Sequence, residues 1–475
     1  MHKHLEVIKK MGLIRSLSVG TSSLVAHQAK FDVISNNLAN ASTVGYKSNR
    51  ANFAEQFNQI YSRGKASESE KGYANGGIDP LQFGLGVKLA SINKDFSQGV
   101  IESTNRPLDV ALQGDGFFVV KNNGVQRFSR FGAFKLDRDG YLVDSNTGGF
   151  IQGYNTAQDM NGITYRSSTG ENMLDRTLSN INIPVSTVSL PRQSQIVTML
   201  GNLNSDANVG FDSTRKTSMI IYDEVGGART LSFTFQKVDE NDWLIGAEID
   251  GVNQGNGAEG IIALNPNDPT AILPAFGRVT FNPDGTIGSV VPNNSTTSPY
   301  TLTFPGGTIV NANGGIDKFP KDLHITLADP SNLSLGLKQY AADSNANFES
   351  QDGWTLGELE DLQVDPRGRI LGSFTNGQTE VLAQLAMAKF ANNEGLINVG
   401  MNYFKVGPDS GDPIIGTAIE TFSTSQMVGN ALEQSNVDLT AQFTDMISTQ
   451  RAFEAASRTV TVSDTLLQEI NQLKR

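Results

Sequence analysis

Large apolar residues recur at seven-residue spacing near both ends of the chain. The first series has Leu17, Leu24, Phe31 and Leu38 at sevens, with Leu13 and Ile34 on the adjoining row; these six residues are named here the N-terminal seam. The C-terminal seam has Leu439, Met446, Phe453, Val460 and Leu467 at sevens, supported by Phe443 and Ile470. Because residues three, four and seven apart share one face of a helix, each seam predicts a long helix with a narrow apolar stripe.

Polar residues mark the limits of both predicted helices. Asparagines and a glycine end the first helix between residues 36 and 45. Ser435 and Asp438 have the spacing of a capping box at the start of the second helix. Lys474 and Arg475 close that helix, where its dipole favours cations.

The first residues imitate a secretory signal. Basic residues precede Met11, but Arg15 interrupts the apolar run and no small-residue cleavage site follows. We therefore predict no cleaved signal peptide. Residues 1–10 are a possible over-read start, with Met11 as the alternative initiator.

Between the helices the pattern is that of β-hairpins. Residues 136–142, 281–287 and 364–370 share Asp or Asn at the second position and Gly at the fifth, flanked by apolar residues. This order predicts type I turns with a glycine bulge. Alternation over 116–120 and 230–235 predicts strands. Further turns are expected at the Asn-Gly pairs that begin at Asn123, Asn161, Asn313 and Asn376.

Both apolar seams need a partner, because an isolated helix is only marginally stable in water. The seams lie at opposite ends of the chain and have the narrow period of helix-on-helix contacts. We expect them to be buried on each other and on neighbouring copies of the chain; packing within a single domain is the alternative. Before assembly, residues 11–45 and 435–475 are then expected to be largely disordered.

Composition narrows the class of protein. The 475 residues carry 37 Lys and Arg against 49 Asp and Glu, a net charge of −12, which argues against nucleic acid as a partner. No run reaches the roughly 20 apolar residues of a membrane-spanning helix, so membrane insertion is not expected. The absence of cysteine excludes disulfides and thiolate metal sites. Gly is abundant at 48 residues, as expected of a turn-rich, largely β protein.

No constellation of catalytic or cofactor-binding residues is recognisable. The acidic turn at 137–144 is too short for a 12-residue calcium loop. Asp409-Ser410-Gly411 resembles half of an aspartic-protease site, but that chemistry requires a second carboxylate segment, which the chain lacks. We predict a protein without catalytic, metal or cofactor sites, and not an enzyme.

Both termini resemble the signatures of the bacterial flagellar rod and hook proteins. The matching segments are 36–40 with 44–47 at the N-terminus, and 435–439, 446–447 and 450–454 at the C-terminus. The signature residues are Asn36, Asn37, Asn40, Gly45, Tyr46, Lys47, Asn436, Asp438, Gln450 and Arg451. Internal segments at 201–204, 221–223, 230–235, 351–354, 373–378 and 390–396 are similar to the hook members of this family.

The resemblance implies a fold that is α+β and mainly β, with discontinuous β-domains inserted between two long terminal helices that pair in a coiled-coil-like layer. The expected parts are a terminal helical domain, a linker, a middle β-domain and an inserted outer β-domain. Their ranges are 11–45 plus 430–475, 46–75, 76–154 plus 346–429, and 155–345.

The resemblance also implies a function. The chain would be a structural subunit that assembles into a short curved tube, a flexible joint that transmits torque from rod to filament. Its partners would be itself, the distal-rod and hook-filament junction proteins, the hook cap and the flagellar export apparatus. It would lie in the flagellar hook, outside the cell. The alternatives are a straight distal-rod subunit and, from another class, an extracellular adhesive or carbohydrate-binding β protein.

Overall fold

The computed structural model of the chain forms two compact units, each described separately. Unit 1 comprises Met1–Val185, Asp361–Gly372 and Glu380–Arg475, and unit 2 comprises Ser186–Glu360 and Ser373–Thr379. The structure describes residues 2–64, 79–157, 172–184, 186–210, 213–255, 261–263, 272–291, 300–309, 319–329 and 332–472. The terminal helices and a β-domain therefore share one unit, while the insertion forms the other.

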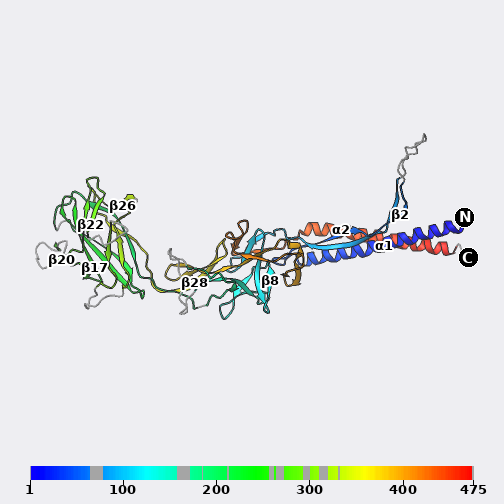
Figure 1. Ribbon diagram of the computed structural model, residues 1–475, viewed down its shortest axis with the longest axis horizontal. Coiled ribbons are helices and arrows are strands. Elements are labelled where there is room, and N and C mark those ends of the chain that lie inside the picture. Colours follow the sequence, from blue (N-terminus) through cyan, green and yellow to red (C-terminus); the bar gives the residue numbers. More distant parts are fainter. Residues whose placement is uncertain are drawn as a thin grey trace, which may run out of the picture. The chain divides into compact units, whose positions relative to one another are not determined.

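Two long helices of unit 1 pair side by side, which confirms the prediction. They are α1 (His2–Ala39) and α2 (Leu439–Gln472), and both chain ends lie at the same end of the pair (Figure 1). The hydroxyls of Ser16 and Ser463 are 3.3 Å apart, and Asn37 Nδ2 donates to Gln442 Oε1 at 3.1 Å. These contacts join the start of one helix to the end of the other, so the pair is antiparallel.

The predicted start of the second helix is corrected by one turn. Asp438, not Ser435, caps α2, because its Oδ1 accepts from the backbone N–H of Thr440 at 2.8 Å and of Ala441 at 3.1 Å. Ser435 Oγ instead accepts from the N–H of Val437 at 3.3 Å. Ser435 and Asp438 therefore do not form a capping box together. Lys474 and Arg475 lie outside the described residues.

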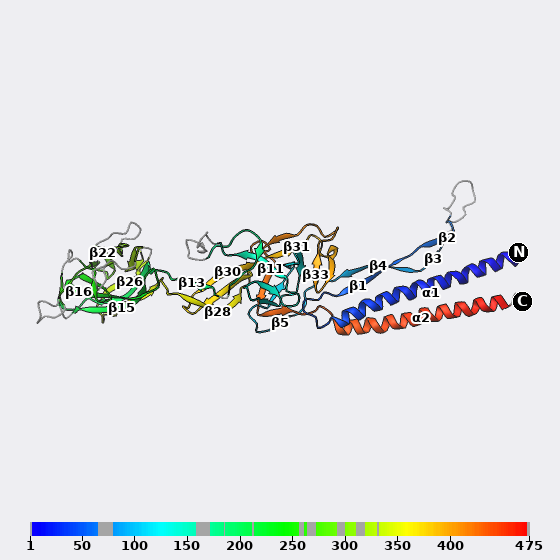
Figure 2. The same cartoon turned by 90° about the horizontal axis from the view of Figure 1, so that it is seen from below.

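A two-stranded ribbon runs beside α1 (Figure 2). It contains β1 (Asn49–Glu55) paired with β4 (Val87–Lys94), and β2 (Asn58–Ser62) paired with β3 (Leu81–Gly84). The described part of the predicted linker, 46–64, thus contains two strands and that prediction is corrected. Paired residues lie between 19 and 45 positions apart in the sequence, which a local pattern does not reveal.

The β-domain of unit 1 is built on one antiparallel sheet. Its central order is β30-β11-β7-β8-β33-β32, formed by Thr379–Leu385, Phe150–Asn155, Phe117–Asn122, Val125–Ser129, Tyr403–Lys405 and Ile397–Gly400. Phenylalanines 117, 128, 390 and 404 form its core through edge-to-face ring contacts. The predicted strand at 116–120 is confirmed as β7.

Shorter elements complete unit 1. Strand pairs join β5 (Ile101–Ser103) to β36 (Ala431–Glu433) and β6 (Val110–Gln113) to β35 (Gln426–Gly429), so the chain preceding α2 is bound to the β-domain. The remaining elements are β9 (Phe134–Leu136), β10 (Leu142–Asp144), β12 (Ser179–Asn180), β31 (Met387–Lys389), β34 (Ile414–Gly416) and the short helix η2 (Asn393–Gly395). Strands β28 (Gly357–Val364) and β29 (Arg369–Phe374) follow the insertion.

The three predicted type I turns are confirmed. In each, the glycine N–H donates to the carbonyl three residues earlier: Gly140 to Asp137, Gly285 to Asn282 and Gly368 to Asp365. These glycines have φ between +76° and +82°, which explains the glycine of the pattern. Asn123 also lies at a hairpin tip, between β7 and β8. Asn161 and Asn313 lie outside the described residues.

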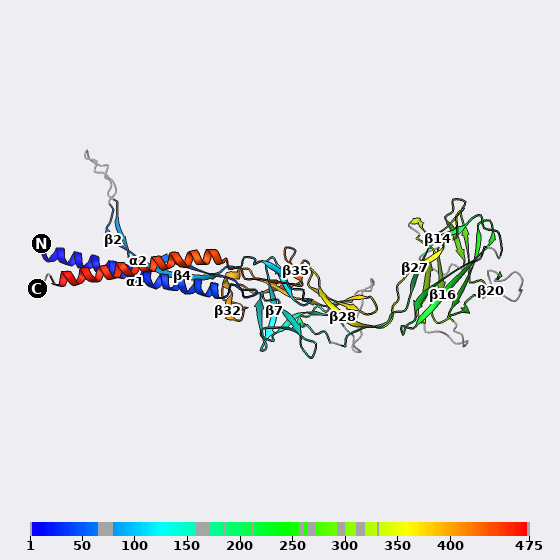
Figure 3. The ribbon, with the colours of Figure 1, turned by 180° about the vertical axis from the view of Figure 1, so that it is seen from behind.

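Unit 2 contains two six-stranded sheets that enclose one apolar core (Figure 3). The first has β15 (Arg215–Tyr222), β16 (Ala228–Asp239), β17 (Asp242–Ile249), β21 (Gly277–Phe281) and β22 (Ile287–Val291), with β18 (Val252–Asn253) on β17. The second has β23 (Thr301–Phe304), β24 (Leu323–Thr326), β14 (Ile196–Asn204), β26 (Asn332–Tyr340) and β25 (Ala328–Asp329), with β27 (Asn347–Gln351) on β14. Short strands β13 (Val188–Ser189), β19 (Ile261–Ala263) and β20 (Ile272–Pro274) complete the unit. The predicted strand at 230–235 is confirmed within β16.

Candidate self-assembly surface

Small and polar side chains make the contact between α1 and α2. Thr449, Ala456 and Ser463 of α2 are buried at seven-residue spacing. On α1, a Cβ added to Gly20 would lie 2.8 Å from Val460 Cγ2, closer than ordinary van der Waals contact allows. The helices therefore approach closely because the row that faces the partner lacks bulk. Each of these three α2 residues follows a member of the C-terminal seam by three positions in the sequence.

The seam residues are divided between buried and exposed positions. Ile34 is buried, whereas seven are half-buried: Leu17, Leu24, Leu38, Met446, Val460, Leu467 and Ile470. Four remain exposed: Phe31, Leu439, Phe443 and Phe453. The side chain of Leu13 lies outside the described residues. The pairing of the helices within one chain thus covers only part of both seams.

An exposed apolar stripe follows the first half of α2. It consists of Leu439, Phe443, Ile447 and Phe453, which are 41 to 53% exposed and share one broad face of the helix. The ribbon beside α1 also exposes large apolar side chains, namely Phe57, Ile60, Tyr61, Leu81 and Phe83. Contiguous apolar surface of this kind marks protein–protein contact sites.

Signature asparagines join the end of α1 to the first strand and to α2. Asn37 is buried; its Nδ2 donates to the Asn49 carbonyl at 2.8 Å and its Oδ1 accepts from the Asn49 N–H at 2.8 Å. The Tyr46 hydroxyl donates to Asn36 Oδ1 at 2.8 Å, and Asn40 Nδ2 donates to the Asn36 carbonyl at 2.9 Å. A side-chain amide can satisfy a donor and an acceptor at once, which explains why asparagines occupy this bend.

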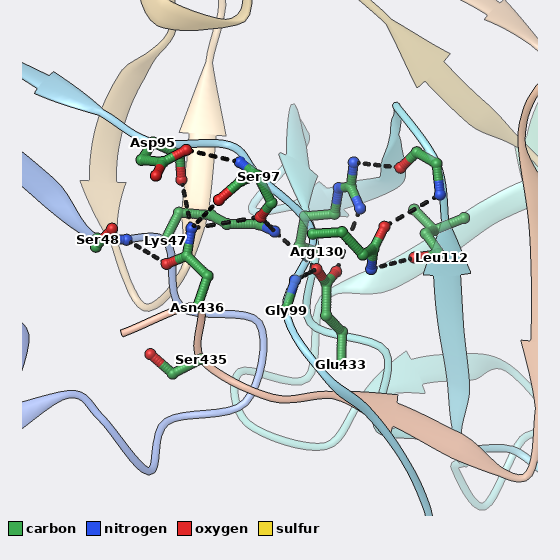
Figure 4. A network of polar contacts seen from close by, with 12 residues as sticks. Lys47, Ser48, Asp95, Ser97, Gly99, Leu112, Arg130, Glu433, Ser435 and Asn436 are labelled. Atoms are coloured by element: carbon green, nitrogen blue, oxygen red, sulfur yellow. Dashed lines mark hydrogen bonds and ion pairs between the residues drawn. The ribbon is translucent and has the colours of Figure 1, made fainter. Parts of the chain in front are cut away.

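Lys47, which follows Tyr46 in the chain, belongs to a buried ionic triad (Figure 4). Lys47 Nζ is 2.7 Å from Glu433 Oε1, and Arg130 NH1 is 3.2 Å from Glu433 Oε2. Glu433 also accepts from the Gly99 N–H at 2.9 Å. These three side chains come from the segment after α1, from the β-domain and from the segment before α2. The triad therefore ties the roots of both helices to the sheet.

Backbone contacts reinforce the triad. The Gly45 N–H donates to the Glu433 carbonyl at 2.7 Å, and a Cβ on Gly45 would lie 2.9 Å from the Arg130 backbone. Gly45 also has φ +68°, so both space and conformation require glycine there. Asn436 Oδ1 accepts from the Ser48 N–H at 2.8 Å. Six signature residues, Asn36, Asn37, Asn40, Gly45, Tyr46 and Lys47, thus share one junction with Asn436.

Burial determines the electrostatics of the triad. It lowers the pKa of Lys47 below the ordinary value for lysine, and the Glu433 carboxylate partly offsets this effect. The pKa of Arg130 is lowered by burial in the same way, again opposed by Glu433. The arrangement offers no group for general acid–base chemistry on a substrate, since Lys47 and Glu433 are fully buried. Its role is structural.

Sequence reasoning did not identify Arg130 and Glu433. One sign of a buried charge was present in the sequence: Glu433 is an acidic residue that directly follows Ala431 and Leu432 in a short apolar strand. Conversely, the signature residues Gln450 and Arg451 are exposed on α2 and lie outside the junction.

Across the described residues, no group of three potential ligands could hold a metal ion. No helix there is long and apolar enough to cross a membrane.

Sequence comparisons agree with this architecture. Family models match residues 17–47 (Flagella basal body rod protein), 111–203 (Flagellar hook protein FlgE/F/G D1 domain), 198–354 (Flagellar basal body protein FlaE D2 domain) and 428–473 (Flagellar basal body rod FlgEFG protein C-terminal). The flagellar hook protein FlgE of Treponema pallidum is 33% identical over 98% of this chain and 100% of its own length. The chain belongs to the flagellar hook protein FlgE family.

Other members of the hook protein family match over comparable lengths. Those of Borreliella burgdorferi and Escherichia coli are 31% and 30% identical, each over 97% of this chain and 100% of their own length. The chain is therefore a structural subunit of the flagellar hook. Family membership favours the hook subunit over the rod subunit and the adhesive β protein.

Proposed function

We propose that this hook subunit assembles with copies of itself into a short curved tube, a flexible joint that transmits torque from rod to filament. The paired terminal helices form the inner layer of the tube, the β-domain of unit 1 the middle layer and unit 2 the outer layer. The observation that carries this proposal is the exposed apolar stripe on α2, which the partner helix of the same chain leaves uncovered.

The stripe is large enough to matter energetically. Fully burying a Leu, Ile or Phe side chain contributes about 1.5–3 kcal/mol. Four side chains that are each about half exposed therefore offer about 3–6 kcal/mol per subunit, before the entropic cost of association. The N-terminal and C-terminal seams would be covered by neighbouring copies, which makes the inner layer the cohesive part of the tube.

Charge supports a looser outer layer. Unit 2 contains nine Lys and Arg against 20 Asp and Glu, a net charge of −11, whereas unit 1 contains 28 against 29, a net charge of −1. Like-charged units repel within a Debye length of about 10 Å at 0.1 M salt. Contacts between outer units of adjacent copies are therefore weak and can slide as the tube bends.

The same proposal names the partners and the location. The tube would meet distal-rod proteins at one end and junction proteins at the other, grow beneath a hook cap, and receive subunits from the flagellar export apparatus. It would lie outside the cell. The protein would not be an enzyme.

The Phe453→Ser variant tests whether the inner layer holds the tube together while the outer layer contributes little to cohesion. We expect this variant to lose polymerisation, whereas Glu454→Ser, a control at the neighbouring exposed position, keeps it. Deletion of residues 204–332 from the outer unit should leave polymers that form but differ in stiffness. Polymerisation that survives Phe453→Ser and fails on the deletion would reverse the roles of the layers. Electron microscopy separates the curved hook from its straight rod alternative.

A further inference from the structure

Two apolar residues of unit 1 adopt a left-handed backbone. Seven non-glycine residues in the described part of the chain have positive φ, and five of them are Asn or Asp, whose side chains tolerate this region. The other two are Met401 (φ +53°) and Ile419 (φ +64°). A residue without such a side chain is strained in this conformation, and strain of this kind persists where it serves a function.

Met401 lies at the tip of a hairpin on the edge of the sheet. The hairpin joins β32 to β33, and Gly400 pairs with Tyr403, so Met401 and Asn402 form the two-residue loop. Both have positive φ, the geometry of a type I′ turn, in which Asn-Gly is preferred. The hairpin between β7 and β8 has that preferred sequence, with Asn123 and Gly124 at its tip.

The edge strand β32 is short, with a register shift between Asn398 and Gly400, but it presents an uncharged and partly apolar edge. Among the described strands, β32 is the last of its sheet, so one side of its backbone faces no further strand. Met401 is 70% exposed, and Ile397 and Val399 are each 41% exposed. No charged residue occurs from residue 395 to residue 404. Charged residues commonly guard the edge strands of soluble proteins, because an apolar edge invites contact with another chain.

We infer that β32 and Met401 form a contact surface for a second copy of this chain. The inference rests on the proposed polymer, which brings copies together. Asn402 Nδ2 donates to the Val44 carbonyl at 2.8 Å, and Ser129 Oγ donates to the Asn402 carbonyl at 3.0 Å. The tip is thus anchored at the root of α1, next to the helices of the inner layer. A rigid apolar knob costs little entropy when it docks.

Met401→Gly separates this role from a purely structural one. Glycine relieves the backbone strain and removes the knob, so the variant should unfold at a higher temperature than the unmodified chain. The Met401 side chain is 70% exposed in the single chain and would be covered in the polymer. Its loss should therefore raise the critical concentration for polymerisation about 5- to 30-fold. Val399→Lys, a charge on the edge strand, should weaken polymerisation while leaving the melting temperature unchanged.

Asn123→Gly serves as the control, since it changes a left-handed hairpin tip that is polar. It should leave the critical concentration unchanged. If the unmodified chain polymerises, and Met401→Gly and Val399→Lys polymerise at the same critical concentration as it does, the inference is overturned but the proposed function is not. An unmodified chain that never polymerises would overturn the proposed function and the inference with it.

Discussion

Glu433→Gln is the most informative single substitution in unit 1. The change keeps the shape of the side chain but removes the only carboxylate of the buried ionic triad. Lys47 and Arg130 would then remain as two buried cations that have lost their paired carboxylate. Removing one partner of a buried ion pair typically costs about 3–5 kcal/mol of folding free energy, because the remaining charge stays desolvated.

Two independent signals can assign this loss to the correct unit. Both tryptophans, Trp243 and Trp354, lie in unit 2, whereas the triad and both long helices lie in unit 1. In urea titrations, the hydrogen exchange of buried amides in the sheet of unit 1 should therefore report a lower midpoint, while tryptophan fluorescence keeps its original midpoint. The linear dependence of stability on denaturant converts the shift of midpoint into free energy.

The pH dependence supplies a second signature of the triad. Since burial lowers the pKa of Lys47, the folded state releases this proton before the unfolded state does as pH rises. Stability therefore increases with pH from the lowered pKa of Lys47 in the folded state up to its pKa in the unfolded state, the ordinary lysine value of about 10.4. The deficit of Glu433→Gln should narrow over that range. It should not vanish, because Arg130 keeps its charge.

Asp445→Asn provides the matched control for an exposed ion pair. Lys30 Nζ lies 3.4 Å from Asp445 Oδ1, with the two side chains 28% and 52% exposed. Loss of such a pair typically costs less than about 1 kcal/mol. If Glu433→Gln were no more destabilising than Asp445→Asn, the junction would not depend on its buried charges and the reasoning would be refuted.

Three further predictions concern the helices and the β-domain. Gly20→Ala should weaken the pairing of the helices, seen as lower helicity and poorer polymerisation. Addition of Val460→Ala should restore both by making room for the new methyl group, and failure of this rescue would contradict the close contact. Burial raises the pKa of Tyr403, so above pH 10 the unfolded state loses a proton that the folded state keeps, and stability falls with pH. The stability advantage of the original chain over Tyr403→Phe should therefore shrink by roughly 1.4 kcal/mol per pH unit above pH 10, measured by urea titration, and a constant difference would exclude this titration. In free subunits, amide hydrogens of residues 11–45 and 435–472 should exchange rapidly because neighbouring copies do not cover the seams, whereas slow exchange in both segments would contradict a role for assembly in ordering them.

Local patterns were sufficient for several elements. Seven-residue spacing predicted both terminal helices, because a helix repeats its facing positions within two turns and its sequence alone carries that period. The three hairpin turns followed from Asp or Asn and Gly at fixed positions, since a left-handed residue and an i to i+3 hydrogen bond are local requirements. The terminal signatures around Asn37 and Asn436 resembled the rod and hook family on the same local basis.

Local patterns failed where two distant segments decide the outcome. The capping box at Ser435 misplaced the helix start. The strand that ends at Glu433 pairs with β5, and Asp438 caps the first turn of α2. The linker predicted at 46–75 contains β1 and β2, whose paired residues follow 19 to 45 positions later.

The sequence by itself determined that two long amphipathic helices flank a turn-rich β region, and that the chain resembles the axial proteins of the flagellum. Only the tertiary structure decided which residues each helix buries. Thr449, Ala456 and Ser463 face α1, while Phe443 and Phe453 remain outside. It also decided that Glu433 meets Lys47 across 386 positions. The physical reason is that periodicity is a property of one segment, whereas burial and desolvation depend on the segment that packs against it.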